Sequence, residues 1–364
     1  MLYMNGFEKW DIAFREQKLD VFNNNIEGLL WLKVRAICRG RQLKEFLAEN
    51  NITLNSTKVS DQNRELFDIL INRVDASVIL DRFLQCMNHE WYNEMGVDIR
   101  QLKEDLYKVQ YYSWGGDQNN SLDKYFISRY VKIISKFSEL QSRQSEIGAN
   151  AWNYVQNSWY NNWTSFIIES LFKQNPRVIS AVGEIKSVDF FIDEYPIDLK
   201  VTFFPNQFME QKLKNILGTS EKSWLKKKCK NLGISCDTKA SEPQQIYTLT
   251  EKLMEVGRSD IIRELEVVRG QIIEESQRNP IELIRWLYEN QGEMRFGAEN
   301  RLYLVLADSN DFTQAWKMKR AFSLIEPKIK QYIESFSSAS LKKVQFEFKK
   351  RKYSTLADIL FIVK

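Results

Sequence analysis

Apolar residues recur at helical spacing through most of the first 150 residues. The pattern predicts helices over three segments: Ile26–Leu47, Leu66–Cys86 and Tyr125–Leu140. Asn51–Asn63 is a polar connector, and the Gly- and Asn-rich run from Ser113 to Ser121 predicts a loop. We therefore expect a helical N-terminal region spanning residues 1–150.

A helix rich in tryptophan is predicted next, from Ala151 to Gln174. Its aromatic residues recur at helical spacing on one stripe, which is the pattern of core packing: Trp152, Trp159, Trp163 and Phe166. Asn175-Pro176 ends this helix. Arg177–Ile185 then predicts a first strand that ends near Gly183.

A β-hairpin is predicted over Ser187–Thr202. Apolar, β-prone runs lie on either side of Asp193-Glu194, which is the sequence pattern of two strands joined by a turn. A turn centred there pairs Ile192 with Tyr195. Any symmetric lengthening of the loop keeps the same register.

This register brings two carboxylates together. Asp189 lies opposite Asp198, and side chains alternate along a strand, so Pro196 and Lys200 share their face. The other face is apolar and consists of Val188, Phe190, Ile192, Ile197, Leu199 and Val201. Like charges whose Cβ atoms are roughly 5 Å apart are destabilising, so we expect a divalent cation such as Mg²⁺ between them.

The remaining chain predicts more helices and three strands. The helices are Asn206–Leu217, a helical insertion over 218–298 with caps near Ser241 and Asn279, and Phe312–Phe336 with Pro327 kinking or splitting it. The strands are Arg301–Ala307, Val344–Phe348 and Leu356–Val363. We therefore predict an α/β fold with a central mixed sheet flanked by helices.

The numbers of histidine and cysteine residues argue against several kinds of active site. The chain has one histidine, His89, which we expect on a helix surface; this argues against histidine-rich zinc sites and Ser-His-Asp triads. Its four cysteines form no Cys-x-x-Cys pair and are expected to be free thiols: Cys38, Cys86, Cys229 and Cys236. We find neither a signal peptide nor a membrane-length apolar run, so we expect a soluble cytoplasmic protein without a membrane partner.

The hairpin resembles a known nuclease motif. Asp189, eight residues, then Asp198-Leu199-Lys200 is similar to the PD-(D/E)XK motif of restriction-endonuclease-like nucleases, with Val188 where the family's proline often stands. The predicted order of one helix and three strands also resembles that family's αβββαβ core. The resemblance covers residues 151–364, including the insertion, and leaves residues 1–150 as a separate domain for recognition or dimerisation.

The resemblance implies a chemistry and a partner. Asp189 and Asp198 would bind Mg²⁺, with the Leu199 main-chain carbonyl as a third ligand and Mn²⁺ as a substitute. Lys200 would orient the attacking water, and Glu169 matches the acidic residue that the family's first helix often supplies. The implied function is a type II restriction endonuclease that cuts double-stranded DNA as a homodimer.

Clusters of basic residues are candidate DNA contacts, with a solvated surface as the other interpretation. They are Lys226, Lys227 and Lys228; Lys350, Arg351 and Lys352 in a predicted turn after Lys349; and Arg35, Arg39, Arg41 and Lys44, with Trp114 in a nearby loop. The net charge of +4 is too small to decide between these interpretations.

Three alternatives stay open. The same core occurs in phage-defence and DNA-repair nucleases. A non-catalytic nucleic-acid-binding protein with a degenerate nuclease fold is the candidate from another class. The motif could also be a surface hairpin in which Lys200 neutralises two acids, although this does not explain the order of the surrounding elements.

Overall fold

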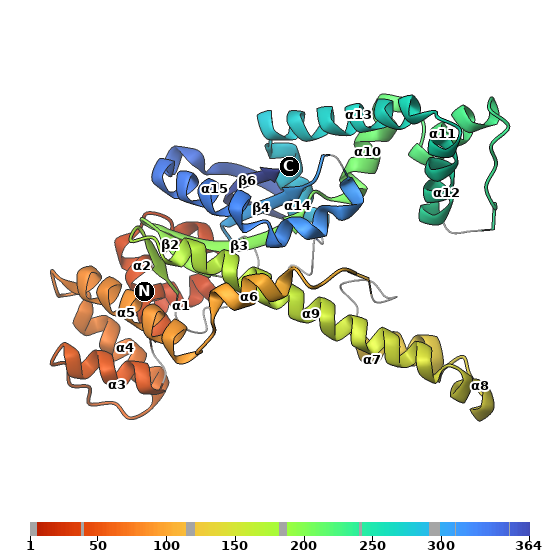
Figure 1. Cartoon of the computed structure of the whole chain (residues 1–364). Helices are drawn as coiled ribbons and strands as arrows, with labels where there is room; N and C mark the ends of the chain where they lie inside the picture. Colours follow the sequence, from red (N-terminus) through yellow and green to blue (C-terminus); the bar gives the residue numbers. More distant parts are fainter. Residues whose placement is uncertain are drawn as a thin grey trace. The chain divides into compact units, whose positions relative to one another are not determined.

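The computed structural model describes residues 6–37, 40–113, 121–181, 188–239, 242–290, 299–309, 311–348 and 350–364 (Figure 1). The chain forms two compact units. The first contains Met1–Leu199, Gly292–Arg301 and Lys319–Ser340; the second contains Lys200–Gln291, Leu302–Met318 and Leu341–Lys364. The predicted domain boundary at residue 150 falls inside a continuous helix, α9 (Gln144–Lys173). The division between the two units instead passes through two strands, after Leu199 and after Arg301.

Six strands form one mixed sheet in the order β1-β2-β3-β4-β6-β5. Their bounds are β1 (Val178–Ser180), β2 (Phe190–Ile192), β3 (Tyr195–Phe203), β4 (Arg301–Ala307), β5 (Lys342–Phe348) and β6 (Arg351–Val363). Strands β1, β2 and β3 pair antiparallel in sequence order. The main-chain N–H of Asp198 donates to Asn300 and that of Phe204 to Leu306, so β3 and β4 advance in the same direction and run parallel.

The hairpin has the register that the sequence predicts. Ile192 pairs with Tyr195, and Phe190 pairs with Ile197. Asp193 takes the left-handed conformation with φ 51°, which aspartate tolerates better than most residues because its short side chain can bond locally. The turn therefore joins the strands through two residues, and the pairing of β2 with β3 extends to Phe190 and Ile197.

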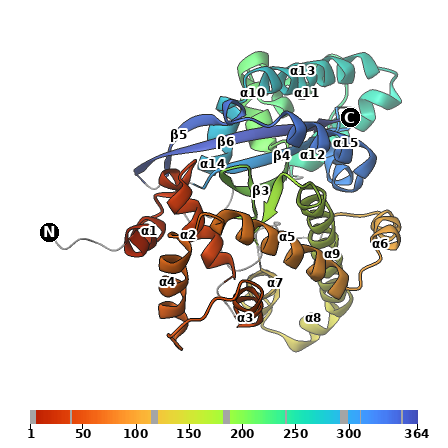
Figure 2. The same cartoon turned by 90° about the vertical axis from the view of Figure 1, so that its left-hand side faces the viewer.

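Helices cover the strands of the first unit. Its N-terminal helices are α1 (Gly6–Arg15), η1 (Leu19–Phe22), α2 (Ile26–Ile37), α3 (Gly40–Glu49), α4 (Val59–Leu70) and α5 (Ala76–Glu94). Figure 2 shows α1, α2, α4 and α5 grouped together. The apolar faces of these N-terminal helices form one core around Trp10 and Trp31, and this core reaches Ile179 and Phe191 of the sheet. Phe191 lies on the hairpin face that we expect to be polar, two residues after Asp189. The N-terminal core therefore covers this face at Phe191.

Helix α9 packs against Phe190 of β2, the residue before Phe191. Phe172 and Phe190 are fully buried and stack with ring centroids 5.2 Å apart. Arg177 fixes this end of the unit, because its guanidinium donates to Asp193 at 2.6 Å and to the main-chain oxygen of Ile333 at 2.6 Å. The second of these bonds satisfies a carbonyl in the last turn of α15 (Phe322–Ser335).

The prediction that the aromatic stripe on α9 packs in the core is wrong. The exposed fraction is 64% for Trp152 and 36% for Trp159, whereas Trp163 and Phe166 are half-buried. The side of the helix that is buried instead carries Tyr160, Ile167 and Phe172 among others. Helical spacing predicts which residues share a face, but it does not show what covers that face.

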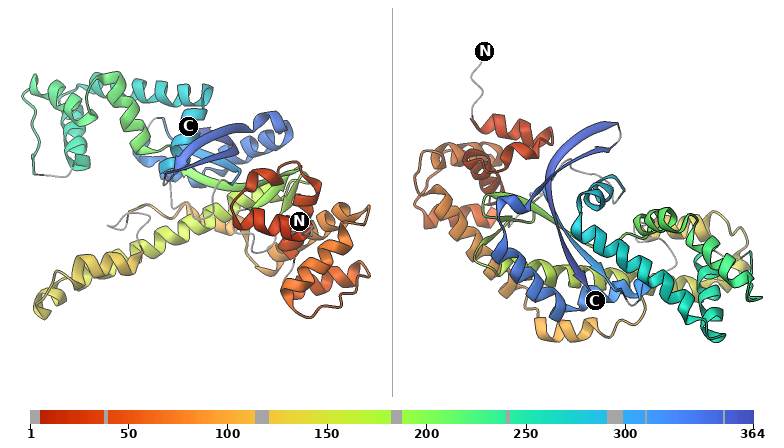
Figure 3. Two further views of the ribbon diagram at one scale, coloured as in Figure 1. Left: turned by 180° about the vertical axis from the view of Figure 1, so that it is seen from behind. Right: turned by 90° about the horizontal axis from the view of Figure 1, so that it is seen from above.

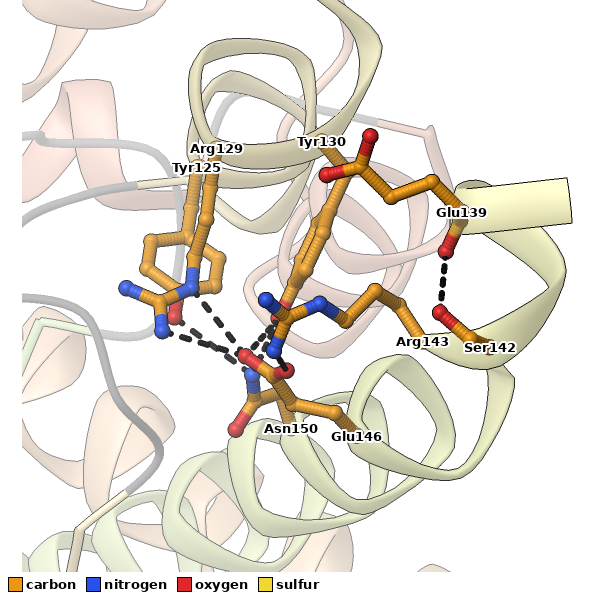
Figure 4. A network of polar contacts seen from close by, with 8 residues as sticks. All are labelled: Tyr125, Arg129, Tyr130, Glu139, Ser142, Arg143, Glu146 and Asn150. Carbon is orange, nitrogen blue, oxygen red and sulfur yellow. Dashed lines mark hydrogen bonds and ion pairs between the residues drawn. The ribbon is translucent and has the colours of Figure 1, made fainter. Parts of the chain in front are cut away.

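The first unit also contains short helices: α6 (Ile99–Leu106), α7 (Leu122–Phe126), η2 (Ile127–Val131) and α8 (Phe137–Ser142). Glu146 of α9 accepts hydrogen bonds from Arg129, Tyr130 and Arg143, and these bonds lower the pKa of its carboxyl group (Figure 4). Asn150 donates to the Tyr130 hydroxyl at 2.8 Å. This network ties η2 to the first turns of α9.

The second unit contains the predicted helical insertion. Its helices are α10 (Asn206–Leu217), α11 (Glu221–Lys230), α12 (Glu242–Glu255), α13 (Ser259–Arg278) and α14 (Ile281–Asn290). In the same unit β5 and β6 form a long two-stranded ribbon (Figure 3). Tyr288 of α14 stacks on Phe346 of this ribbon at 4.5 Å and meets Tyr303 edge-on at 5.5 Å, so an aromatic stack joins helix and strands.

Several predicted segments are divided differently. Ile26–Leu47 forms two helices rather than one, and Leu66–Cys86 is interrupted by a turn between α4 and α5. Tyr125–Leu140 contains part of α7, a π-helical turn and the start of α8. Phe312–Phe336 begins with the 3₁₀ helix η3 (Phe312–Arg320) before α15. The predictions for Asn206–Leu217 and Arg301–Ala307 are confirmed to the residue.

The two faces of α9 differ in a way that mutations can test. Phe172→Ala should lower the free energy of unfolding by about 3–5 kcal/mol, because it removes a fully buried ring. Trp152→Ala, the control on the exposed side, should cost less than about 1 kcal/mol. Urea unfolding followed by circular dichroism measures both; an equal loss would contradict the assignment of faces.

Candidate active site

The hairpin holds Asp189 in place beside β3. The main-chain N–H of Asp189 donates to Ile197 at 2.9 Å, and its carboxylate accepts a 2.7 Å hydrogen bond from the Leu199 N–H. Asp189 precedes β2, and both bonds join it to residues of β3 on either side of Asp198. Whether the two carboxylates share one face, as the sequence predicts, stays a prediction.

Asp198 is buried, at 5% exposure, and faces an arginine. Its Oδ2 lies 3.3 Å from Nε of Arg301, the first residue of β4, although the contact lacks the geometry of a hydrogen bond. Arg301 is itself buried and donates through Nη2 to Glu299 at 3.0 Å. One guanidinium thus lies between two buried carboxylates from neighbouring chain segments.

Asn300 fixes the segment between Glu299 and Arg301. Its side-chain amide donates to the Pro196 carbonyl at 3.0 Å and exchanges hydrogen bonds with the side chain of Asn23, which precedes α2. Its own carbonyl accepts the Asp198 N–H at 2.9 Å. The N-terminal helical region therefore contacts the candidate site directly through Asn23.

Glu169 and Lys200, the other predicted catalytic residues, are less buried than Asp198. Glu169 on α9 pairs with Lys173 one turn later, and its side chain is 36% exposed. Lys200 is exposed on β3 and belongs to the second unit. Glu169 does not complete a metal site: across the described ranges, no three His, Cys, Asp or Glu side chains are close enough to hold a metal ion.

The donor types nevertheless fit Mg²⁺. This ion needs only one or two carboxylates, since water fills its remaining coordination positions. Asp189 and Asp198 supply two, and Asp198 Oδ2 is a buried oxygen that makes no hydrogen bond. The Leu199 main chain, predicted to supply a carbonyl ligand, is fixed by its N–H bond to Asp189.

The predicted basic clusters differ in their contacts. Lys228 pairs with Glu264 at 2.7 Å and lies over the Trp224 ring, whereas Lys227 is exposed and Lys226 is half-buried. The predicted turn holds only Lys350, because Arg351 and Lys352 already belong to β6, where both are exposed. Lys349 lies outside the described residues.

The N-terminal basic cluster is spread over two helices. Arg35 of α2 lies over the Trp31 ring, Arg41 of α3 pairs with Glu45 at 2.9 Å, and Lys44 is exposed. Arg39 and Trp114 lie outside the described residues.

The predictions for the histidine and for the cysteines of the described residues are confirmed. His89 is exposed on α5, as predicted. Cys86, Cys229 and Cys236 are free thiols, and Cys38 lies outside the described residues.

Sequence reasoning missed Glu299, Arg301 and a buried lysine, Lys319. The first two are charged residues at the edge of an apolar run, Leu302–Ala307, which was their only signal. Lys319 Nζ donates to Asn161 Oδ1 at 2.8 Å, and the Tyr112 hydroxyl donates to the same oxygen at 2.7 Å. Burial lowers the pKa of Lys319 from 10.5 to about 8.

Comparison with known protein families, with curated proteins and with solved structures finds no match to this chain. Among the described residues, no helix is long and apolar enough to cross a membrane.

The reciprocal Asn23–Asn300 bonds should be energetically coupled. A double-mutant cycle with Asn23→Ala and Asn300→Ala should give a coupling energy of about 1 kcal/mol, because each amide is the other's partner. Thermal and urea unfolding of the four proteins measure this energy. Strict additivity would show that the pair does not tie the N-terminal helices to the site.

Lys319 should make stability depend on pH. The folded protein binds Lys319's proton more weakly than the unfolded chain, so stability should rise as pH increases from about 8 to 10.5. Lys319→Met removes the cost of burying the charge and should stabilise the protein by up to roughly 3 kcal/mol below pH 8. Urea unfolding from pH 7 to 10.5 measures this gain, which should shrink with pH; a constant gain would contradict the shifted pKa.

Proposed function

We propose that the protein is a Mg²⁺-dependent endodeoxyribonuclease of the PD-(D/E)XK type with an αβββαβ core. The observation that carries this proposal is the β2–β3 hairpin, in which Phe190 pairs with Ile197 and the Asp189 carboxylate accepts the N–H of Leu199, the residue after Asp198. The sequence of elements around it is in keeping with the same fold: α9, three antiparallel strands, helices, and then β4 parallel to β3.

Asp189 and Asp198 hold the cation, and Mn²⁺ is expected to substitute for Mg²⁺. When bound, the ion supplies charge neutralisation at the scissile phosphate and a lowered pKa for a water molecule. Lys200 comes two residues after Asp198 in β3, the separation that puts two side chains on one side of a strand. In this proposal its ammonium group orients the attacking water and stabilises the negative charge that develops on the phosphate.

The finer proposal is a type II restriction endonuclease that cuts double-stranded DNA as a homodimer. The N-terminal helices and the insertion α11–α14 are the parts of the chain outside the core that could read a DNA sequence. Exposed lysines such as Lys227 and Lys350 are candidate phosphate contacts. A phage-defence or repair nuclease would share the same catalytic residues.

A non-catalytic nucleic-acid-binding protein is the second candidate, and one contact favours it. Arg301 lies beside Asp198 and offsets part of its charge, so the carboxylate already has a cationic neighbour without a metal ion. In such a protein the hairpin would be purely structural. Metal binding and cleavage therefore separate the two functions.

Cleavage of supercoiled and linear DNA with Mg²⁺ tests the proposal. Wild type should cut, and Asp198→Asn and Lys200→Ala should each reduce the rate by at least about a hundredfold. Glu299→Ala is not a suitable control because of its contact with Arg301; Lys343→Ala, a surface change on β5, should leave the rate unaltered.

The products distinguish the finer functions. Discrete fragments would support a restriction endonuclease, and nicking or smearing would support another nuclease. Inert wild type with several DNAs and metals would overturn the enzyme proposal.

A further inference from the structure

The N-terminal half of α9 exposes one uncharged stripe. The exposed fraction is 64% for Trp152, 55% for Val155 and 36% for Trp159. Residues separated alternately by three and four positions lie on one side of a helix, as in the seam of a coiled coil. Six exposed residues of α9 have this spacing, and we call them the α9 stripe: Ser145, Gly148, Trp152, Val155, Trp159 and Asn162.

The α9 stripe lacks the charges of a solvated helix face. From Ile147 to Ile168 the sequence contains no Asp, Glu, Lys or Arg. The opposite side of α9 is occupied within the same unit, because Asn150 donates to Tyr130 and Asn161 accepts a hydrogen bond from Tyr112. A helix that is buried on one face usually carries charged residues on the other. Nucleic acid is a poor partner for this stripe, because its phosphates are bound by Lys and Arg.

Gly148 is the least expected residue of the α9 stripe. Glycine inside a helix costs roughly 1 kcal/mol relative to alanine. A Cβ atom added at Gly148 would meet no atom within 4 Å, so the packing of the described chain does not require glycine there. Ala149 beside it is also small and exposed. These two residues allow a large side chain of another molecule to approach the helix backbone closely.

The α9 stripe complements itself when two copies lie antiparallel. Let Trp152 of one chain face Val155 of the second copy. The helical register then places Trp159 opposite Gly148, and the polar residues at the two ends of the stripe opposite each other. Each tryptophan thus meets a smaller residue. A parallel pair would place each residue opposite itself, so that tryptophan meets tryptophan and Gly148 leaves a gap.

The area of the α9 stripe is sufficient for a reversible dimer. A tryptophan side chain buries about 150–250 Å² when it is fully covered. With the exposed fractions given above, two stripes would together remove on the order of 1,000 Å² of surface from water, which is near the lower limit for a specific interface. We therefore expect a dissociation constant in the micromolar range.

We propose that the α9 stripe is the contact surface of a symmetric dimer, in which α9 packs antiparallel against α9 of a second copy of this chain. Twofold symmetry makes every contact occur twice. The inference rests on the homodimer named in the proposed function, but it requires neither a metal ion nor DNA. Trp152 and Trp159 supply most of the covered area, and Gly148 accommodates Trp159 of the second copy.

Charges introduced at Val155 test whether this surface forms the dimer. Val155 lies near the twofold axis of the antiparallel pair, so the two side chains at this position come close together. Val155→Glu and Val155→Lys should each weaken dimerisation at least about tenfold, because like charges then meet. An equimolar mixture of the two variants should dimerise again, because the charges are then opposite. Val78→Glu is the matched control: Val78 is 58% exposed on α5 of the same unit, and this change should leave dimerisation unaltered.

Exchange of a large and a small residue tests the antiparallel register. Gly148→Trp places two tryptophans opposite each other and Trp159→Ala leaves a gap, so each change should weaken dimerisation about tenfold. The double variant Gly148→Trp/Trp159→Ala restores one large and one small residue at each contact, so it should dimerise more tightly than either single variant. A parallel pair would not recover, because it joins identical positions.

Sedimentation equilibrium of the full-length proteins without metal or DNA gives the dissociation constants, and circular dichroism shows whether each variant is folded. A wild type that stays monomeric up to about 100 µM, far above a micromolar dissociation constant, would overturn the inference. So would a dimer that Val155→Glu leaves intact, or a mixture or double variant that does not recover. The nuclease proposal fails separately: a dimer that does not cut DNA keeps this surface, and a monomer that cuts DNA keeps the nuclease.

Discussion

The two-residue turn at Asp193 and Glu194 is the constraint on which the candidate site depends. It fixes the register of β2 against β3, and a slip of one residue would exchange the faces of every side chain in the hairpin. Contacts from distant segments support the turn: Arg177 bonds Asp193, and the main-chain N–H of Asn24 bonds the Glu194 carbonyl. The position of Asp189 beside β3 is thus secured from both strands and from the helices before them.

Charged groups in the interior are the second feature that distinguishes this fold. Asp198, Glu299, Arg301 and Lys319 are all buried, and Lys33 forms another buried contact with Asp81 at 2.5 Å. Removing such groups from water costs more than their pairing usually returns, so they are poor stabilisers. Asp198, Glu299 and Arg301 therefore add little to the stability of the fold, although removal of one of them would leave a buried charge uncompensated.

Local patterns predicted the hairpin, its register, β4 and α10, because each depends on residues close together in sequence. The breaks between helices were harder to predict: the residues between α4 and α5, from Ile71 to Asp75, include neither glycine nor proline. The sequence patterns predicted least well which side chains are buried and which are exposed. Arg301 reaches Asp198 only because β3 and β4 are neighbours, and Trp152 is exposed because nothing in the described chain packs over its side of α9. Both facts depend on tertiary neighbours that helical and strand periodicity do not contain.

The parallel pairing of β3 and β4 has a consequence for how the chain folds. Helices α10 to α14 all lie between these strands in the sequence, so the pairing closes one of the longest loops in the molecule. Closing such a loop loses chain entropy before any contact compensates for it, whereas the β2–β3 hairpin closes locally. The β2–β3 hairpin can therefore form early during folding, while Arg301 meets Asp198 only when the sheet is completed.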